Sequence, residues 1–119
     1  MSSGRSEVTF TNSYGKKMYV AYMRRDFDCQ PECGDIWDVL GWINLDAGET
    51  ETRANATNNR WYYYYAEADD GAVWAGPYVA EVSNAKFQKC TCLGAKATYY
   101  YVGFRELDTK TYSGVNFIP

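Results

Sequence analysis

The stretch Trp61-Tyr62-Tyr63-Tyr64-Tyr65-Ala66-Glu67-Ala68 opens with five consecutive aromatic side chains. Aromatic residues favour strands, and successive side chains of a strand point to opposite faces of the sheet. Trp61, Tyr63 and Tyr65 therefore share one predicted face, while Tyr62 and Tyr64 share the other. We expect one of these faces to pack in a core and the other to meet a second interface or solvent.

Strand and turn signals continue in both directions from this stretch. Asp69-Asp70-Gly71 predicts a type I′ hairpin turn, because an Asp-Gly pair supplies the positive φ that this turn needs. Residues 17–24 are apolar on both faces, as in a central strand, and residues 49–53 alternate charged with β-branched side chains, as in an edge strand. Further strands are predicted at residues 7–11, 39–45, 73–74, 78–82, 86–90, 98–106 and 115–118.

These segments amount to about eight to ten short strands at the spacing of a sandwich or small barrel. No window shows a clean helical stripe with a cap and a stop signal. The 119 residues suffice for one domain with an ordinary core. The sequence therefore predicts an all-β fold, an antiparallel β-sandwich with little or no helix. A single domain is expected over residues 7–118, preceded by an N-terminal arm of residues 1–6.

Composition narrows the classes of function. The chain has no histidine, which excludes Ser-His and Cys-His nucleophile pairs and every His-ligated metal site. A formal net charge of −3 argues against nucleic-acid binding, which depends on phosphate neutralisation. The acidic group Glu67, Asp69 and Asp70 has too few oxygens for calcium and is interpreted as part of a turn. We expect neither an enzyme nor a protein that holds a cofactor or a metal.

The N-terminal sequence Met1-Ser2-Ser3-Gly4-Arg5 lacks the apolar region of a signal peptide. No apolar run approaches the roughly 18 residues of a transmembrane helix. We therefore expect no membrane span and a cytoplasmic location at synthesis. Release to the exterior stays open as an alternative.

The four cysteines come in two close pairs, Cys29/Cys33 and Cys90/Cys92. Disulfides, a four-thiolate zinc site and free thiols in a reducing compartment are all open. On one strand, the Cα atoms of Cys90 and Cys92 would lie about 6.6 Å apart, near the upper limit for a bridge. Bridges from one pair to the other therefore have better geometry than two local bridges, and the cysteines could also crosslink subunits.

Five blocks occur in the order in which a known family carries them. They are Phe10-Thr11-Asn12, Gly41-Trp42-Ile43-Asn44-Leu45-Asp46-Ala47-Gly48-Glu49, Tyr62-Tyr63-Tyr64-Tyr65-Ala66-Glu67, Val73-Trp74-Ala75-Gly76 and Gly103-Phe104-Arg105-Glu106-Leu107-Asp108-Thr109. Over roughly residues 7–118, the set resembles the bacterial family called domain of unknown function 1036. The resemblance implies a small β-rich domain, often on exported proteins, with no established activity. Where family members often carry cysteine, this chain has Thr11 and Thr50.

Aromatic residues supply the candidate binding surface. Of the 12 Tyr, 5 Phe and 4 Trp, eight fall within residues 61–65 and 99–101. Tyrosine and tryptophan bury large areas and dominate binding hot spots. The predicted surface consists of Trp61, Tyr63, Tyr65, Tyr99 and Tyr101, with a polar rim of Asn58, Asn59 and Arg60.

This surface predicts a non-catalytic structural or interaction module that self-assembles into a homo-oligomer or polymer, or that binds another protein. The alternative is a carbohydrate-binding, lectin-like domain whose polar rim bonds the hydroxyls of a glycan. Residues 7–11 are expected either to form an edge strand of their own sheet or to complete a neighbouring subunit's sheet by strand addition.

Overall fold

The computed structural model describes residues 7–25, 37–54, 61–83, 87–90, 99–109, 112 and 114–119, and β-strands are the only regular secondary structure among them. The predicted all-β fold is confirmed, and each strand begins and ends within two residues of its predicted range. None of the described residues forms a helix long and apolar enough to cross a membrane. The strands are β1 (Glu7–Asn12), β2 (Met18–Arg25), β3 (Trp37–Leu45), β4 (Thr50–Ala54), β5 (Trp61–Ala68), β6 (Val73–Trp74), β7 (Tyr78–Ser83), β8 (Phe87–Cys90), β9 (Tyr99–Asp108) and β10 (Gly114–Phe117).

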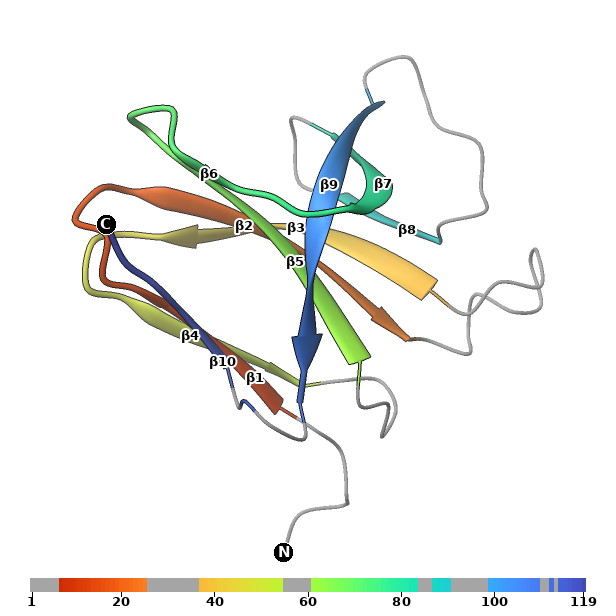
Figure 1. Ribbon diagram of the computed structural model, residues 1–119, viewed down its shortest axis with the longest axis horizontal. Helices are drawn as coiled ribbons and strands as arrows, with labels where there is room; N and C mark the ends of the chain where they lie inside the picture. Colours follow the sequence, from red (N-terminus) through yellow and green to blue (C-terminus); the bar gives the residue numbers. More distant parts are fainter. Residues whose placement is uncertain are drawn as a thin grey trace, which may run out of the picture.

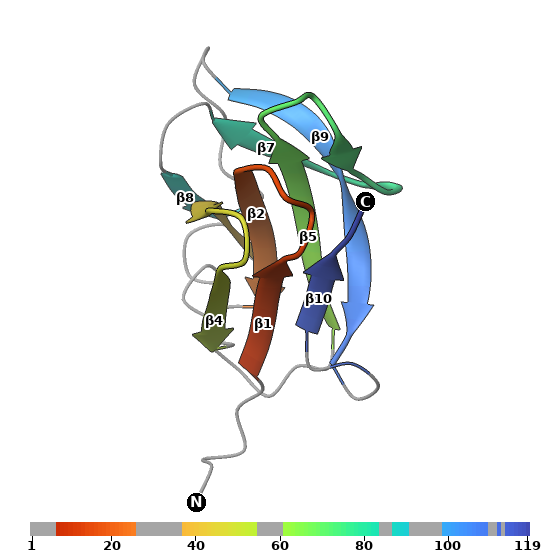
Figure 2. The same cartoon turned by 90° about the vertical axis from the view of Figure 1, so that its left-hand side faces the viewer.

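The strands form two sheets that pack as a sandwich (Figure 1). The small sheet has the order β10-β1-β4, and the large sheet has the order β7-β9-β5-β2-β3-β8, with β6 paired to β5. Figure 2 shows the small sheet as a layer in front of β2 and β5. As predicted, β2 is a central strand and β4 lies at an edge. All pairs are antiparallel except β1 with β10, which run parallel.

Strand β1 corrects both expectations for residues 7–11. It is neither an edge strand nor available for addition to a neighbour, because it is the middle strand of the small sheet. The antiparallel strand β4 pairs along one side of it, and β10 returns from the end of the chain to pair along the other. Pairing between segments so far apart in sequence leaves no local signal, which is why the sequence did not reveal it.

The first core lies between the two sheets. Phe10 stacks on Phe117 within the small sheet, with ring centroids 6.3 Å apart, and Tyr22 stacks on Tyr62 within the large sheet at 5.7 Å. Tyr62 is completely buried, so the even-numbered face of the aromatic stretch is a core face. The other buried members are Val8, Met18, Val20, Ile43, Leu45, Ala66, Ala68 and Leu107.

A buried asparagine fixes the end of β1 against the large sheet. The side-chain amide of Asn12 donates to the carbonyl oxygens of Lys16 at 2.6 Å and Leu45 at 2.9 Å. Its side-chain oxygen accepts a bond from the backbone N–H of Tyr14 at 3.0 Å. Since Asn12 is 0% exposed, these bonds replace the water that burial removes, and they tie the small sheet to β3.

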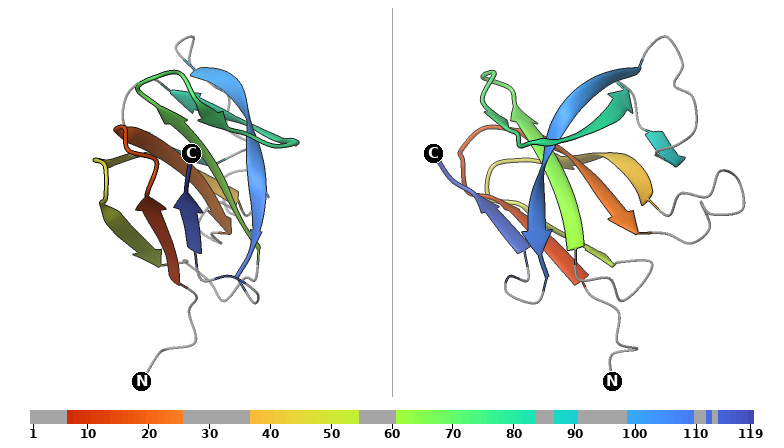
Figure 3. Two further views of the ribbon diagram at one scale, coloured as in Figure 1. Left: turned by 60° about the vertical axis from the view of Figure 1, so that its left-hand side comes forward. Right: turned by 45° about the vertical axis from the view of Figure 1, so that its right-hand side comes forward.

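The second core lies on the opposite face of the large sheet. Strand β9 pairs with β5 through residues 105–108 and with β7 through residues 99–104. Figure 3 shows β9 as a long, strongly curved strand that leaves β5 toward β7. The β7–β9 ribbon brings Ala80, Val82 and Phe104 onto Ala21, Met23, Val39 and Tyr65. Both faces of β2 and β5 are therefore covered.

An irregularity in β3 lets that strand serve both cores. The register between β2 and β3 shifts between Val20 and Tyr22, so that Val20 pairs with Ile43 but Tyr22 pairs with Leu40. Leu40 packs on the first core, whereas Trp42, two residues later, packs on the second. In a regular strand, the side chains of Leu40 and Trp42 would lie on the same face. The extra residue in β3 therefore turns the Trp42 side chain to the opposite face.

The hairpin turn after β5 is not of the predicted type. Gly71 has a φ of 90°, and no described residue other than glycine has a positive φ. A type I′ turn needs positive φ at both central residues, which are Asp69 and Asp70 here. The bonds from Gly71 N to Ala68 O at 3.0 Å and from Ala68 N to Ala72 O at 2.8 Å fit a type I turn followed by a left-handed glycine.

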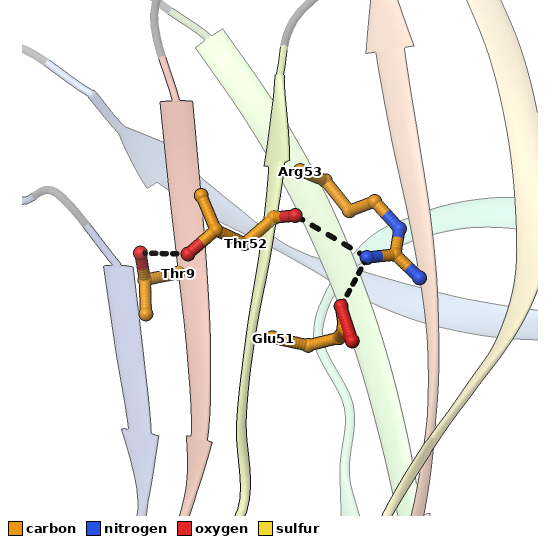
Figure 4. A network of polar contacts seen from close by, with 4 residues as sticks. All are labelled: Thr9, Glu51, Thr52 and Arg53. Carbon is orange, nitrogen blue, oxygen red and sulfur yellow. Dashed lines mark hydrogen bonds and ion pairs between the residues drawn. The ribbon is translucent and has the colours of Figure 1, made fainter.

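The outer face of the small sheet is polar. The hydroxyls of Thr9 and Thr52 are 3.0 Å apart, and those of Thr11 and Thr50, which face each other across β1 and β4, are 3.2 Å apart. Figure 4 shows Thr9 and Thr52 on one side of the sheet and the Glu51–Arg53 ion pair on the other. Inward-pointing charges on an edge strand discourage pairing with a further strand.

The contact between β1 and β10 requires glycine at position 114, which predicts a specific instability. A Cβ atom on Gly114 would lie 2.0 Å from the carbonyl oxygen of Thr9. We expect Gly114→Ala to destabilise the fold by about 1–3 kcal/mol, the usual cost of overpacking. Thermal unfolding followed by circular dichroism measures the loss. The exposed Asn116→Ala on the same strand is the control, with an expected change within about 0.5 kcal/mol; equal melting temperatures for both variants would contradict the β1–β10 register.

Candidate functional site

The β7–β9 ribbon covers only part of the large sheet's second face. Over the covered part, Tyr65 is 7% exposed and packs on Trp42 and Phe104, with ring centroids 6.1 and 6.2 Å away. The indole N–H of Trp42 donates to the carbonyl oxygen of Ser83 at 2.6 Å and so joins β3 to the end of β7. This end of the aromatic row is therefore core.

Beyond the start of β7, the same face opens into an aromatic cleft of about 310 Å³, lined by Met23, Trp37, Tyr63, Tyr78 and Val79. The ring centroids of Trp37 and Tyr63 lie 5.3 Å apart at an angle of 75°, and those of Tyr63 and Tyr78 lie 5.0 Å apart at 53°. Met23 is 8% exposed, whereas Tyr78 is 42% and Val79 65% exposed. The three rings therefore form part of the wall of this cleft.

A carboxylate stands beside the two tyrosine hydroxyls of the aromatic cleft. Glu106 on β9 is the register partner of Tyr63 on β5, and the Tyr63 hydroxyl donates to its Oε2 at 3.4 Å. Glu106 also lies near the hydroxyl of Tyr78. Burial, followed by the Glu106 charge, raises the pKa of Tyr63, and Glu106 is the main cause of the raised pKa of Tyr78. Both hydroxyls therefore remain protonated donors at neutral pH.

Elsewhere the acidic side chains accept from other tyrosines. Tyr14 donates to Asp70 at 2.6 Å, Tyr19 to Asp69 at 2.9 Å, and Tyr65 to Glu67 at 3.0 Å. Asp70 also accepts from the backbone N–H of Ala72, which closes the turn. Of the three acidic residues, Asp70 thus closes the predicted turn, whereas Glu67 lies within β5. Among the described residues, no three Cys, Asp or Glu side chains cluster as metal ligands would.

The predicted surface residues whose side chains the structure describes, Trp61, Tyr63, Tyr65 and Tyr101, do not form one site. Tyr63 lines the aromatic cleft, Trp61 is half-buried two residues before it, and Tyr65 is buried in the second core. Tyr101 is 70% exposed on the outer side of the β7–β9 ribbon, opposite Glu81. For Tyr99 the structure describes the backbone pairing alone, and the predicted rim of Asn58, Asn59 and Arg60 lies outside the described residues.

Four residues of the aromatic cleft and its acidic neighbour were missed from the sequence. Met23, Trp37, Tyr78 and Val79 come from three strands other than β5, and Glu106 comes from a fourth. Their strands were predicted, but the curvature of β9 that brings β7 over β5 has no periodic signal. The Gly76-Pro77 break before Tyr78 was visible and marks where the chain turns onto this face.

The predictions for the cysteines fall largely outside the described structure. Cys29, Cys33 and Cys92 are not among the described residues, and Cys90 is described only by its backbone, which pairs with Asp38 at the end of β8. Disulfides, a zinc site and free thiols all stay open.

Comparison of the chain with protein-family models, curated proteins and solved structures finds no match in any of the three. The resemblance to domain of unknown function 1036 stays a prediction.

The link between Glu106 and the cleft tyrosines predicts a pH-dependent signature. Replacing the carboxylate by an amide in Glu106→Gln removes the charge that favours the protonated phenol, so the pKa of Tyr78 should fall toward its usual value. A smaller fall is expected for Tyr63, where burial is the larger cause. Because both pKa values are raised in the folded protein, their contribution to stability is complete below pH of about 10 and declines above it.

A ¹³C NMR titration of the tyrosine ring carbons measures both values. Glu67→Gln is the matched control, because Glu67 bonds Tyr65 and should leave the titration of Tyr78 unchanged. Identical Tyr78 titrations in the wild-type and Glu106→Gln proteins would refute the arrangement.

Proposed function

We propose that the protein is a non-catalytic interaction module and that the aromatic cleft is its binding surface. The observation that carries this proposal is that three aromatic rings line an accessible cleft on a sheet face that is otherwise core. Small-molecule sites have volumes of about 300–1,000 Å³, apolar walls and a few placed polar groups. The cleft, at about 310 Å³, has apolar walls and the Glu106 carboxylate beside two tyrosine hydroxyls.

The chemistry of the site favours binding over catalysis. Without histidine, the usual neutral-pH proton carrier is absent from the chain. The tyrosines beside Glu106 have raised pKa values, which makes them poorer proton donors and nucleophiles than ordinary tyrosines. These groups are suited to orienting a ligand.

Self-association is a second candidate, supported by an exposed apolar strip that borders the aromatic cleft. Val79 is 65% exposed and Tyr101 70% exposed, and both point outward from the β7–β9 ribbon. Strand β7 ends the order of the large sheet, so one of its edges is not paired by any described strand. A second copy of the chain could cover this strip, and because Val79 also lines the aromatic cleft, such a contact would reach the edge of the cleft.

Carbohydrate binding remains the alternative for the aromatic cleft itself. Tyrosine and tryptophan rings combine large apolar faces with polar atoms, which suits a sugar ring, and Glu106 could accept bonds from sugar hydroxyls. The experiment described next distinguishes a glycan from other ligands of the cleft.

The test is NMR mapping of a fragment library that includes mono- and oligosaccharides against the ¹⁵N-labelled chain. We expect binding fragments to shift the signals of Met23, Trp37, Tyr63 and Tyr78, and Tyr63→Leu to abolish these shifts. Tyr112→Leu, at an exposed tyrosine away from the cleft, should leave them intact. If fragments bind elsewhere or not at all, the cleft is not the binding surface.

Self-association is tested by recording NMR spectra of the protein over a dilution series in the absence of ligand. Concentration-dependent shifts at Val79 and Tyr101 are expected if copies meet through the outer strip. Spectra that do not change on dilution, together with the size of a 13.6 kDa monomer, would remove that candidate.

A further inference from the structure

We propose that the aromatic cleft binds a quaternary ammonium group, the fully alkylated cationic head group of choline-type molecules. The proposal rests on the proposed function, since it names the ligand class of the same cleft. Two observations carry it: three rings inclined to one another around one space, and a carboxylate next to two of them.

The rings provide the first part of the recognition. A cation is attracted to the face of an aromatic ring when it lies within about 6 Å of the centroid, most strongly for tryptophan. The centroid of Tyr63 is 5.3 Å from that of Trp37 and 5.0 Å from that of Tyr78. All three residues line the aromatic cleft, with their rings inclined to one another at 75° and 53°. A cation in the cleft therefore lies beside several aromatic rings.

The negative charge of the Glu106 carboxylate provides the second part of the recognition. The Glu106 carboxylate accepts a bond from Tyr63, and a carboxylate offers about four acceptor positions to further donors. Glu106 is exposed and stands next to the cleft lining, so its attraction for a cation is screened by water and adds to that of the rings. The net charge of −3 on the whole chain adds a weak attraction in the same direction.

The shortage of acceptors selects among cations. A primary ammonium brings three N–H donors and a guanidinium five, each of which needs an acceptor when it is desolvated. Of the lining residues, Met23 and Val79 offer only apolar surface, so the acceptors at the cleft are confined to the tyrosine oxygens and the neighbouring Glu106 carboxylate. A quaternary ammonium has no N–H group to satisfy, and the volume of about 310 Å³ has room for it. A sugar, with many hydroxyls, fits these lining groups less well.

Choline is compared with 3,3-dimethylbutan-1-ol, its neutral isostere, in NMR titrations of the full-length labelled protein. We expect choline to shift the cleft signals and to bind about tenfold more tightly than the isostere, because only choline gains cation–π attraction. Tyr78→Leu and Glu106→Gln should each weaken choline binding several-fold, while Tyr112→Leu should not. Tyr78 is 42% exposed at a strand end, so its replacement spares the core.

Three results would overturn the proposal: equal affinity for the isostere, choline shifts away from the cleft, or no choline shifts while other fragments bind there. The last of these leaves the proposed function intact, whereas an absence of every ligand from the cleft removes both. If choline binds, cosedimentation with phosphatidylcholine vesicles but not with phosphatidylglycerol vesicles identifies a lipid head group as the source. Choline binding without cosedimentation identifies a soluble molecule.

Discussion

The fold depends on burying large side chains on both faces of the same two strands. β2 places Val20 and Tyr22 on one face and Ala21 and Met23 on the other, and all four are at most 8% exposed. β5 likewise places Tyr62 and Tyr64 on the first face and Tyr63 and Tyr65 on the second. One covering layer cannot shield two faces. The small sheet covers the first face, and the large sheet's own edge, bent over as the β7–β9 ribbon, covers the second.

The aromatic cleft is a consequence of this second cover being short. β7 has six residues and lies over the end of the row that holds Tyr65, where the Trp42–Ser83 hydrogen bond fastens it to β3. At Tyr63 and Trp37 the same sheet face continues beyond the ribbon. Aromatic and apolar side chains of the kind that fill the two cores thus become accessible next to the Glu106 carboxylate of β9. The site needs no loop of its own, because the ends of ordinary strands build it.

The sequence predicted what depends on neighbouring residues and failed where distant segments meet. Period-two alternation located the strands, and the apolar character of residues 17–24 identified β2 as central. The turn after β5 was predicted with the wrong type, because Asp-Gly fits two hairpin geometries and only Gly71 takes positive φ here. The middle position of β1 depends on β10, and the split between buried Tyr65 and accessible Tyr63 depends on how far β9 curves. Neither leaves a mark in local periodicity, so among the predicted surface residues whose side chains the structure describes, only Tyr63 lines the aromatic cleft.

The central claim is that the β7–β9 ribbon closes over one part of the large sheet and leaves the rest open. Hydrogen exchange of the Trp42 indole N–H tests this most directly, because that group reaches Ser83 only if β7 lies across β3. In ¹H–¹⁵N spectra after transfer to D₂O, the indole signal is predicted to decay as slowly as the amides of the central strands β2 and β5. Exchange as fast as that of an exposed indole would show that β7 does not cover this face.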